Sequence, residues 1–241
     1  MDLVHSSQYA ILIPIYNAGN LFETLLSRLH KVITSDAGRK YTLMLVDDGS
    51  TPPVREIKMP GIKVQQLRHE KNRGKGAALT GGFSYLLNNT TVDAIITLDA
   101  DMQHPPEKIP DLIAAFEKKS GEIIIGSRTR DPQKMPFHRI LSNMLTSKII
   151  SAVIGQRVAD SQSGFRLYSR KVLENVSAAE KRFHFESEFL IRSGWKGYRI
   201  AAVPIPTIYN GSASSIRNLP DTINFVTVVI KLLIARIRGN V

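Results

Sequence analysis

The chain has 241 residues, of which 43% are hydrophobic and 22% charged, and its formal net charge is +11. This length and composition predict one large globular domain, or one domain with an appendage, and the basic balance favours an anionic partner such as a phosphorylated substrate, a lipid surface or nucleic acid. The absence of cysteine excludes disulfide bonds and thiolate metal sites.

A membrane-spanning or secreted protein is not expected from the apolar segments. The N-terminal run at residues 10–15 is too short for the core of a signal peptide and follows no basic segment. No uncharged apolar stretch reaches the roughly 18 residues of a membrane span. We therefore expect a soluble or peripheral protein.

Buried strands and helices alternate along the first half of the chain. Apolar runs predict strands at residues 9–14, 41–46, 62–67, 92–98 and 122–126, and helical periodicity predicts helices at 21–32, 74–87 and 106–118. This alternation predicts an α/β fold with an open, mainly parallel sheet and helices on both faces.

The second half is less regular. The pattern predicts helices at 139–154, 172–176, 186–193 and 221–238, a polar loop at 155–165, and a strand at 199–205 that Pro204 interrupts. We divide the chain into one domain at residues 1–218 and a C-terminal amphipathic helix at 219–241.

Polar residues follow the ends of four predicted strands. The clusters are Tyr16-Asn17, Asp47-Asp48, Asp99 with Asp101, and Ser127-Arg128. In open parallel sheets, ligands bind beyond the carboxyl ends of the strands, so these clusters predict a shared site.

Asp99 and Asp101 leave the fourth strand one residue apart. Strand side chains alternate between faces, so both carboxylates can point the same way, and together they suit a hard divalent cation. Gln103 could add a neutral oxygen ligand, whereas His104 is interpreted as a loop residue. The alternative is a loop in which the two acids cap backbone amides.

Two further stretches could surround a nucleotide. Asp47-Asp48-Gly49-Ser50 could accept hydrogen bonds from ribose hydroxyls or a base, although Asp-Gly is also an ordinary turn. In the segment 68–76, Lys75 and backbone amides could face phosphate, or the segment is simply a basic turn. Neither a G-x-G-x-x-G pattern nor a Walker A loop is present.

The loop 160–166 carries one acid and one arginine. With Arg128, Arg130 and Arg139 it could form an anion pocket for a phosphorylated acceptor. An ordinary surface loop is the alternative.

The final helix is more apolar than a surface helix requires. Its polar residues Asn224, Thr227, Lys231 and Arg238 form a narrow stripe, which is typical of a helix lying at a membrane interface. The same helix could instead pack on the domain's own core or in a homodimer. The helix at 139–154 is a second candidate for the same membrane surface.

Five stretches in this order resemble one family. They are Ile13-Pro14-Ile15-Tyr16-Asn17, Asp47-Asp48-Gly49-Ser50, the segment 72–79, Leu98-Asp99-Ala100-Asp101-Met102-Gln103, and the segment 160–168. Over residues 9–210 the chain resembles family 2 glycosyltransferases, and among them the polyprenyl-phosphate enzymes similar to dolichol-phosphate mannose synthase.

The resemblance implies a GT-A (nucleotide-diphospho-sugar transferase) fold and an inverting transfer dependent on Mg²⁺ or Mn²⁺. It implies that Asp99 and Asp101 hold the metal and diphosphate, with Gln103 as an auxiliary ligand. It implies nucleotide contacts at Pro14, Tyr16, Asn17, Asp47, Asp48, Lys75 and Ala100. The implied catalytic and acceptor residues are Asp99, Asp101, Arg128, Asp160, Ser163 and Arg166, with Gly164 beside them.

The chain departs from its relatives in two places. Many of them carry membrane-spanning helices after the catalytic domain, and many have an arginine where Pro206 stands here. The stretch 210–215 could still fold over the diphosphate as a lid.

The resemblance implies a GDP- or UDP-sugar donor and a polyprenyl phosphate acceptor, with the protein cytoplasmic and peripheral at the membrane. Phosphate is already ionised and needs no general base. A sugar hydroxyl acceptor, the alternative, would need one, and Asp160, Glu186 and Glu188 are the candidates. A non-enzymatic nucleic-acid-binding protein is disfavoured, because the aromatic residues are scattered and carboxylates stand at the strand ends.

Overall fold

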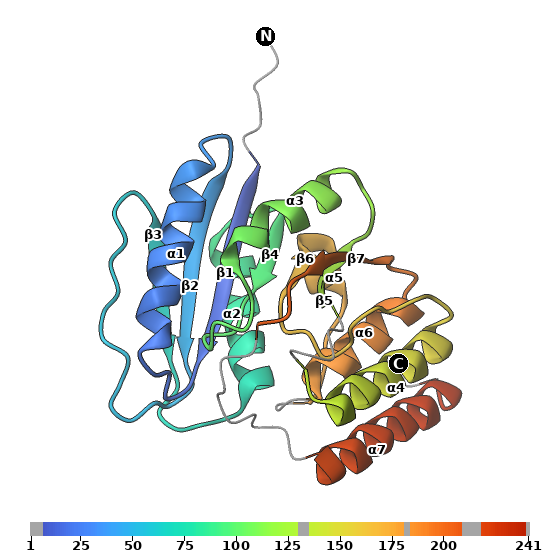
Figure 1. Cartoon of the computed structure of the whole chain (residues 1–241). Helices are drawn as coiled ribbons and strands as arrows, with labels where there is room; N and C mark the ends of the chain where they lie inside the picture. Colours follow the sequence, from blue (N-terminus) through green and yellow to red (C-terminus); the bar gives the residue numbers. More distant parts are fainter. Residues whose placement is uncertain (1–6, 130–134, 181–183, 209–217, 240–241) are drawn as a thin grey trace.

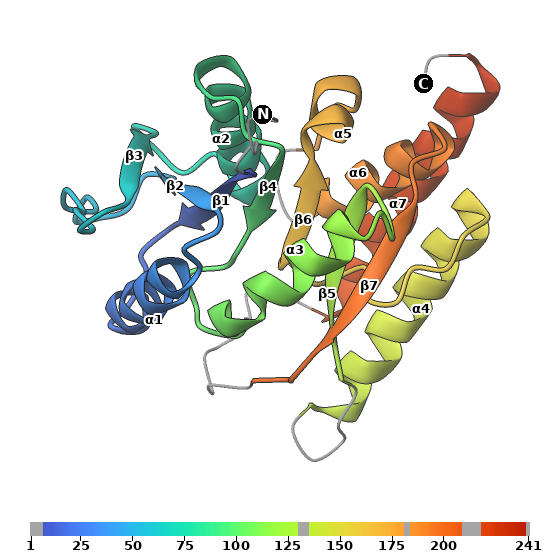
Figure 2. The ribbon, with the colours of Figure 1, turned by 90° about the horizontal axis from the view of Figure 1, so that it is seen from above.

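The structure is a computed structural model that describes residues 7–129, 135–180, 184–208 and 218–239, with side chains described from Asn224 onward in the last range. Its centre is a seven-stranded sheet in the order β3-β2-β1-β4-β6-β5-β7 (Figures 1 and 2). The strands are β1 (Gln8–Ile15), β2 (Lys40–Asp47), β3 (Lys63–Arg68), β4 (Ala94–Thr97), β5 (Ile123–Arg128), β6 (Arg166–Ser169) and β7 (Ile200–Ile205). All are parallel except β6, which runs antiparallel to β4 and β5.

Helices cover both faces of this sheet (Figure 2). They are α1 (Leu21–Ser35), α2 (Lys75–Asn89), η1 (Pro106–Lys108), α3 (Ile109–Glu117), α4 (Phe137–Ile154), α5 (Arg170–Asn175), α6 (Phe185–Trp195) and α7 (Asn218–Ile237). The prediction of a mainly parallel α/β sheet with helices on both faces is confirmed.

Strand β1 shows why the sheet needs cover on both sides. Tyr9, Ile11 and Ile13 pack into the cluster under α1 and α3, whereas Ala10 and Leu12 pack into the cluster under α2 and α6. Successive strand side chains point to opposite faces, and all five are buried here. A strand that is apolar on both faces belongs at the centre of a layered α/β fold.

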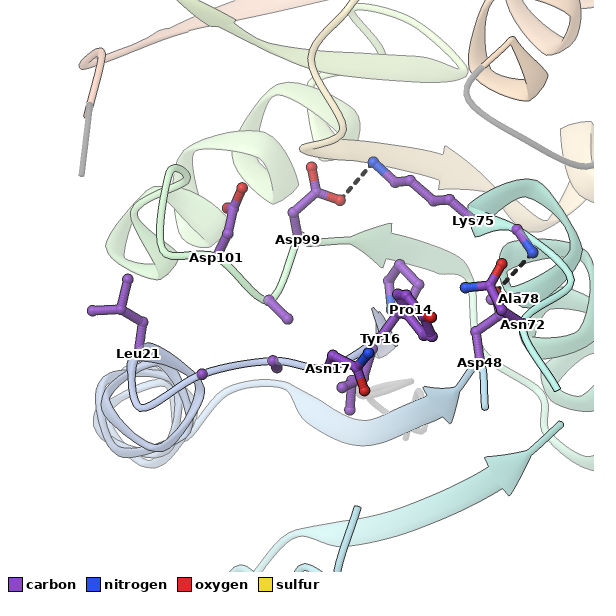
Figure 3. Close-up of a pocket in the computed structure, with 15 residues that line it drawn as sticks. Pro14, Tyr16, Asn17, Leu21, Asp48, Asn72, Lys75, Ala78, Asp99 and Asp101 are labelled. Carbon is purple, nitrogen blue, oxygen red and sulfur yellow. Dashed lines mark hydrogen bonds and ion pairs between the residues drawn. The ribbon is translucent and has the colours of Figure 1, made fainter. Parts of the chain in front are cut away.

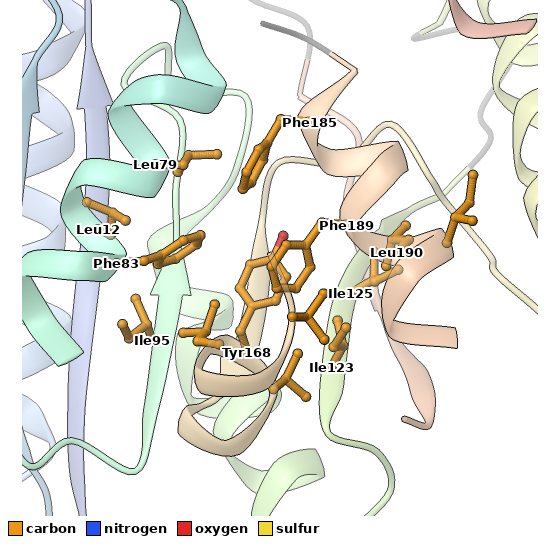
Figure 4. Close-up of a cluster of buried hydrophobic side chains, with 14 of the residues drawn as sticks. Leu12, Leu79, Phe83, Ile95, Ile123, Ile125, Tyr168, Phe185, Phe189 and Leu190 are labelled. Atoms are coloured by element: carbon orange, nitrogen blue, oxygen red, sulfur yellow. The ribbon is translucent and has the colours of Figure 1, made fainter. Parts of the chain in front are cut away.

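An aromatic cluster joins α2, β6 and α6 (Figure 4). The ring centroids of Phe83 and Tyr168 lie 5.5 Å apart, and those of Tyr168 and Phe189 lie 5.2 Å apart at a steep angle. These edge-to-face contacts stabilise the position of α6 over the sheet. The start of α6 is therefore fixed beside the end of β4 and the first residue of β6, Arg166, whose guanidinium donates to the Glu186 carbonyl.

The strands differ from the sequence prediction at two places. No strand was predicted at residues 166–169, and Arg166 was counted in the polar loop, but these residues form β6, whose four residues are all buried between β4 and β5. The strand near the C-terminus is not broken at Pro204, which pairs with Ser127 inside β7. β7 lies at the edge of the sheet, where proline is tolerated because only one side of the strand pairs with a neighbour.

Helix α7 packs on α4 and α6. Phe225, Val228, Val229 and Leu232 are buried in the core, whereas Val226, Ile230, Leu233, Ile234 and Ile237 are exposed. Helix α4 exposes Phe137, Leu141 and Leu145. Among the helices described, none has the length and apolarity to cross a bilayer.

Candidate active site

A cavity of about 630 Å³ opens beyond the carboxyl ends of β1, β2 and β4 (Figure 3). The residues at its wall come from the segments that follow these strands and from the start of α2. The lining residues are those at 14–19, Leu21, Asp48, Asn72, Gly74, Lys75, Ala78 and those at 99–101. The predicted polar clusters after the first, second and fourth strands therefore meet in one place.

Asp48 holds the loop that precedes α2. Its carboxylate accepts hydrogen bonds from the backbone N–H groups of Arg73 at 3.0 Å and Gly74 at 2.8 Å, and its Oδ1 lies 2.7 Å from Nδ1 of His69. The side chain is almost completely buried although it borders the cavity. Asp48 thus positions the backbone amides beside Lys75.

Asp47 lies behind the cavity wall rather than in it. Its carboxylate accepts hydrogen bonds from the N–H groups of Ser50 and Val54 and forms an ion pair with Arg68. Burial opposes ionisation of this group, but the hydrogen bonds from Ser50 and the charge of Arg68 leave its pKa lowered. The adjacent Gly49 has a φ of +80°, and a Cβ there would come within 2.6 Å of the Asn72 nitrogen, so the turn requires glycine.

Tyr16 and Asn17 form the entrance. Tyr16 is 54% exposed at the cavity edge. The N–H of Asn17 donates to Oγ of Ser50 at 2.9 Å, and its side-chain oxygen accepts from the N–H of Thr51 at 2.8 Å. These bonds tie the segment after β1 to the segment after β2.

Lys75, the first residue of α2, reaches Asp99 across the cavity (Figure 3). Its Nζ lies 2.6 Å from Oδ1 of Asp99 and 3.0 Å from Oε1 of Glu186 on α6. Burial opposes ionisation of Asp99, but the charge of Lys75 holds the pKa of that carboxyl below its usual range. The pKa of Asp101 is raised by burial and by the negative charge of Asp99.

The chemistry of this pair fits a hard divalent cation. Asp99 and Asp101 both border the cavity, and burial together with the negative charge of Asp99 raises the pKa of Asp101, so a cation beside both carboxylates would favour their ionised forms. The described residues contain no group of three or more histidine, aspartate and glutamate side chains arranged to hold a metal. A cation here would therefore need further oxygen ligands from a substrate, water or a neutral side chain. The backbone N–H of Gln103 donates to Asp101 Oδ1 at 3.0 Å, which places Gln103 in the same turn.

His104 was interpreted as a loop residue, and it does lie in the turn after Asp101. It is nevertheless buried, its ring centroid lies 5.7 Å from that of Phe165, and its Nδ1 lies 3.7 Å from Oδ2 of Asp99. Neither ring nitrogen has a hydrogen-bond partner among the described residues, and burial lowers the pKa of His104 to about 4. With this pKa the imidazole is neutral at physiological pH, and it lies beside Asp99 without lining the cavity.

Arg128 and Asp160 form a buried pair beside the cavity. Nε of Arg128 lies 2.8 Å from Oδ2 of Asp160, its Nη2 lies 3.0 Å from Oδ1, and Asn143 of α4 donates to Oδ1 at 2.5 Å. Burial opposes ionisation of Asp160. The charge of Arg128 and the hydrogen bonds from Arg128 and Asn143 outweigh burial and lower the pKa of Asp160 to about 2. Asp160 therefore fixes the arginine and is a poor proton acceptor.

A second cavity of about 550 Å³ begins at Arg128 and runs along α4. Its lining includes the cations Arg128, Lys148 and Arg157 and no carboxylate. The remaining lining residues are Ser127, Met144, Ser147, Ser151, Val158 and Ala159. This surface can attract an anion.

Ser163 and Arg166 are buried parts of the loop rather than cavity wall. Arg166 has no exposed surface, and its guanidinium donates to the carbonyl oxygens of Ser163 at 2.7 Å, Ser161 at 2.7 Å and Glu186 at 3.0 Å. The hydroxyl of Ser163 accepts from the N–H of Phe165. These residues shape the loop that carries Gly164.

Gly164 lies against the ion pair. A Cβ on this residue would come within 2.5 Å of Oδ2 of Asp99 and 2.6 Å of Nζ of Lys75. The loop backbone can therefore approach the charged centre only because the residue is glycine.

Sequence reasoning missed Asn143 and considered Glu186 only as a base. Helical spacing alone did not indicate that Asn143 faces Asp160 or that Glu186 faces Lys75, because both contacts depend on how α4 and α6 pack. Arg130 and the predicted lid at 210–215 lie outside the described residues. Arg139 lies in the first turn of α4.

Comparison with known proteins identifies relatives that share about a third of their aligned residues with this chain. Residues 10–177 match the family model described as glycosyl transferase family 2. The chain is 31% identical over 181 residues to undecaprenyl-phosphate 4-deoxy-4-formamido-L-arabinose transferase of Edwardsiella ictaluri, covering 73% of this chain but only 53% of that protein. It is 32% identical over 223 residues to UDP-N-acetylglucosamine--dolichyl-phosphate N-acetylglucosaminyltransferase of Methanococcus voltae, covering 83% of this chain and 85% of that protein.

Solved structures share the fold. Glucosyl-3-phosphoglycerate synthase from Mycobacterium tuberculosis, in complex with Mn²⁺, UDP and phosphoglyceric acid, superposes with a TM-score of 0.66 at 18% identity. The match covers 95% of this chain and 78% of that one. The GT-A fold expected from the sequence is confirmed.

Proposed function

The chain belongs to glycosyl transferase family 2, and on this premise we propose that it transfers a sugar, with inversion, from a nucleotide-diphospho-sugar to polyprenyl phosphate. Two relatives covering most of this chain are named as transferases to undecaprenyl or dolichyl phosphate. The donor occupies the cavity at the ends of β1, β2 and β4, and the acceptor phosphate approaches from the side of Arg128.

The donor side is built for a nucleoside diphosphate. Pro14, Tyr16 and Asn17 supply the wall for the nucleoside, and Asp48 presents the loop and the start of α2, whose N-terminus favours negative charge. Lys75 adds a cation at the same point. A Mg²⁺ or Mn²⁺ ion held by Asp99 and Asp101, with Gln103 as an auxiliary ligand, would neutralise the leaving diphosphate.

The acceptor assignment rests on one observation: each of the three carboxylates considered as a general base is already engaged. Asp160 is paired with Arg128, and Glu186 is paired with Lys75. Glu188 accepts from Nε of Arg192 at 2.6 Å and from the N–H groups of Ala179 and Glu180. A sugar hydroxyl needs a base to remove its proton, whereas a phosphate monoester is largely dianionic at neutral pH and needs none.

The exposed apolar surfaces of α4 and α7 supply a membrane face for such an enzyme. Phe137, Leu141 and Leu145 on α4 are exposed, as are Ile230 and Ile234 on α7. The second cavity, with its cations, runs along α4. A peripheral protein with this face would meet a lipid-linked acceptor at the bilayer surface.

The test is a donor and acceptor screen on the full chain. UDP- and GDP-sugars are offered with a short polyprenyl phosphate, with the matching polyprenol, or with a sugar acceptor, in the presence and absence of Mg²⁺ or Mn²⁺. We expect a glycosyl phosphate product from the polyprenyl phosphate alone. The Glu188→Gln variant should keep turnover within about tenfold of wild type, since the carboxylate has no part in proton transfer.

Transfer to the sugar hydroxyl, combined with a loss of about 10² to 10⁴ in turnover for Glu188→Gln, would contradict the proposal. That result would favour a family 2 enzyme acting on a growing glycan. Salt-dependent oligonucleotide binding without any nucleotide-sugar binding would contradict both.

A further inference from the structure

Lys75 lies between two carboxylates that belong to different halves of the chain. Its Nζ is 2.6 Å from Asp99 on the β4 side and 3.0 Å from Glu186 on α6. The three side chains are only 20%, 24% and 10% exposed, so their charges interact through poorly hydrated surroundings. The Lys75 ammonium can therefore pair with either of two carboxylates without a large movement of its side chain.

The same Asp99 is one of the two residues suited to a divalent cation. An ammonium group and a divalent cation repel each other when they share one carboxylate. The lysine cannot retreat toward the loop, because Gly164 already packs against both Asp99 and Lys75. Glu186 is the partner that remains on the other side.

The formal charges of the side chains at this centre are compatible with Lys75 pairing either with Asp99 or with Glu186. Asp99, Asp101, Glu186 and Lys75 together carry a formal charge of −2, which a divalent cation neutralises. The group of four side chains and one divalent cation is then neutral with Lys75 still protonated. In this arrangement Lys75 pairs with Glu186 and the cation binds Asp99. Arg128 does not enter this balance, because Asp160 already neutralises it.

We propose that Lys75 is an internal counter-ion that occupies Asp99 until a divalent cation arrives, and that Glu186 is the positioning residue that then receives it. The inference rests on the proposed function, because it takes Asp99 as a metal-holding residue. Its consequence is that Lys75 weakens binding of the bare metal, so the cation is held firmly only once the donor diphosphate adds its own oxygens and charge. Metal and donor are then loaded together.

The experiment measures Mn²⁺ binding to the donor-free full chain from the electron paramagnetic resonance signal of free Mn²⁺. Lys75→Met keeps the length of the side chain and removes its charge, and it should bind Mn²⁺ about tenfold more tightly than wild type. Glu186→Gln should bind Mn²⁺ about threefold or more weakly, because the lysine then has Asp99 as its remaining carboxylate. Lys118→Met, at an exposed position after α3, removes the same charge and should leave the affinity unchanged.

A double variant distinguishes an effect of Glu186 on the metal through Lys75 from a direct effect of Glu186 on the metal. If Glu186 acts through Lys75, the Lys75→Met/Glu186→Gln chain should bind Mn²⁺ as tightly as Lys75→Met alone. An equal weakening by Glu186→Gln in both backgrounds would show that Glu186 acts on the metal directly and would overturn the proposal. Lys75→Gln, judged folded by its near-ultraviolet circular dichroism, gives the same test if Lys75→Met does not fold.

Unchanged or weaker Mn²⁺ binding by folded Lys75→Met would overturn the counter-ion role while leaving metal-dependent transfer intact. If neither wild type nor any variant binds Mn²⁺, and transfer proceeds without a divalent ion, the metal assignment itself fails and the counter-ion role fails with it.

Discussion

Burial and the charge of Asp99 raise the pKa of the Asp101 carboxyl, whereas the charge of Lys75 lowers the pKa of Asp99 against the effect of burial. The two carboxylates would therefore respond differently to a bound divalent cation. Asp99 would exchange its ion pair with Lys75 for the cation, whereas the cation would offset the repulsion between Asp101 and Asp99.

The Asp101→Asn variant tests that difference. We expect metal-dependent binding of the nucleotide-sugar to weaken by about tenfold or more, because one of two anionic ligands is lost. The melting temperature should stay unchanged or rise, since the repulsion with Asp99 disappears. Calorimetric titration with and without Mn²⁺ measures the affinity for the nucleotide-sugar, and thermal unfolding measures the melting temperature. Asp111→Asn on α3, which makes the same change away from the cavity, is the control. A variant that binds donor and metal like wild type would contradict the role of Asp101.

Asp160 offers a prediction of pH dependence. Its pKa is lowered to about 2 in the folded chain, so its ionised pair with Arg128 stabilises the fold above the unfolded pKa of about 3.9. That contribution is lost as the pH falls from about 4 to 2. Asp160→Asn should lower the free energy of unfolding by about 3 kcal/mol at pH 7, because it leaves Arg128 buried beside a neutral amide.

Urea unfolding at several pH values checks this. The difference between wild type and Asp160→Asn should narrow as the pH falls below about 4. A difference that stays constant down to pH 2 would show that the amide disrupts packing instead of removing a charge.

Several of these residues could be placed from sequence, and others could not. Asp48, Asp99 and Asp101 follow strand ends, and the geometry of parallel sheets brings strand ends together, whereas Lys75 was picked out by the glycines that open the next helix. Arg166 was expected near the acceptor phosphate, yet its guanidinium is buried among loop carbonyls. Residue type and spacing carry no signal that separates an arginine holding a loop from one facing a ligand.

At the scale of elements, β6 shows the same limit. Its first residue was assigned to a polar loop and the other three to no element, and they form a strand because β4 and β5 leave a space between them that a reversed strand fills. Such a strand is stabilised by its neighbours rather than by local propensity. The longer helices and strands carry more apolar residues at helical or strand spacing, and they were predicted within a few residues of their bounds.

Helix α7 has two apolar faces with different expected roles. Leu232 is buried on the inner face, and Leu232→Ala should lower the free energy of unfolding by about 2 to 4 kcal/mol. Joint replacement of the exposed Ile230, Ile234 and Ile237 by glutamine should change stability by less than about 1 kcal/mol while abolishing binding to lipid vesicles. Urea unfolding and vesicle co-sedimentation give the two readouts.

Truncation after Pro220 removes both faces at once and uncovers parts of α4 and α6, so the point variants are the sharper comparison. Vesicle binding that survives the glutamine variant would show that α7 is not the membrane contact.

For the whole molecule, the net charge of +11 predicts how binding to membranes depends on lipid composition and salt. Vesicles that contain anionic lipid should bind the protein at least about tenfold more tightly than neutral vesicles at low salt. The difference should largely disappear near 0.5 M salt, where the screening length falls to about 4 Å. Co-sedimentation across a salt series measures this, and equal binding to both kinds of vesicle would contradict it.

The sheet order places the two halves of the site on separate stretches of sequence. The residues that line the first cavity all fall between positions 14 and 101, and those that line the second fall between 127 and 159. The antiparallel pairing of β4 with β6 joins the two parts. Under the proposed function, a genetic crossover in the turn before α3 would exchange the chain that lines the second cavity, proposed for the acceptor, and keep the chain that lines the first cavity, proposed for the donor. The contacts that must match across such a junction include Lys75 with Glu186, and Asp99 and Thr97 with Gly164. Recombination at this junction would then introduce a new acceptor side beside the same donor wall, provided that the incoming chain supplies the partners of Lys75 and Asp99.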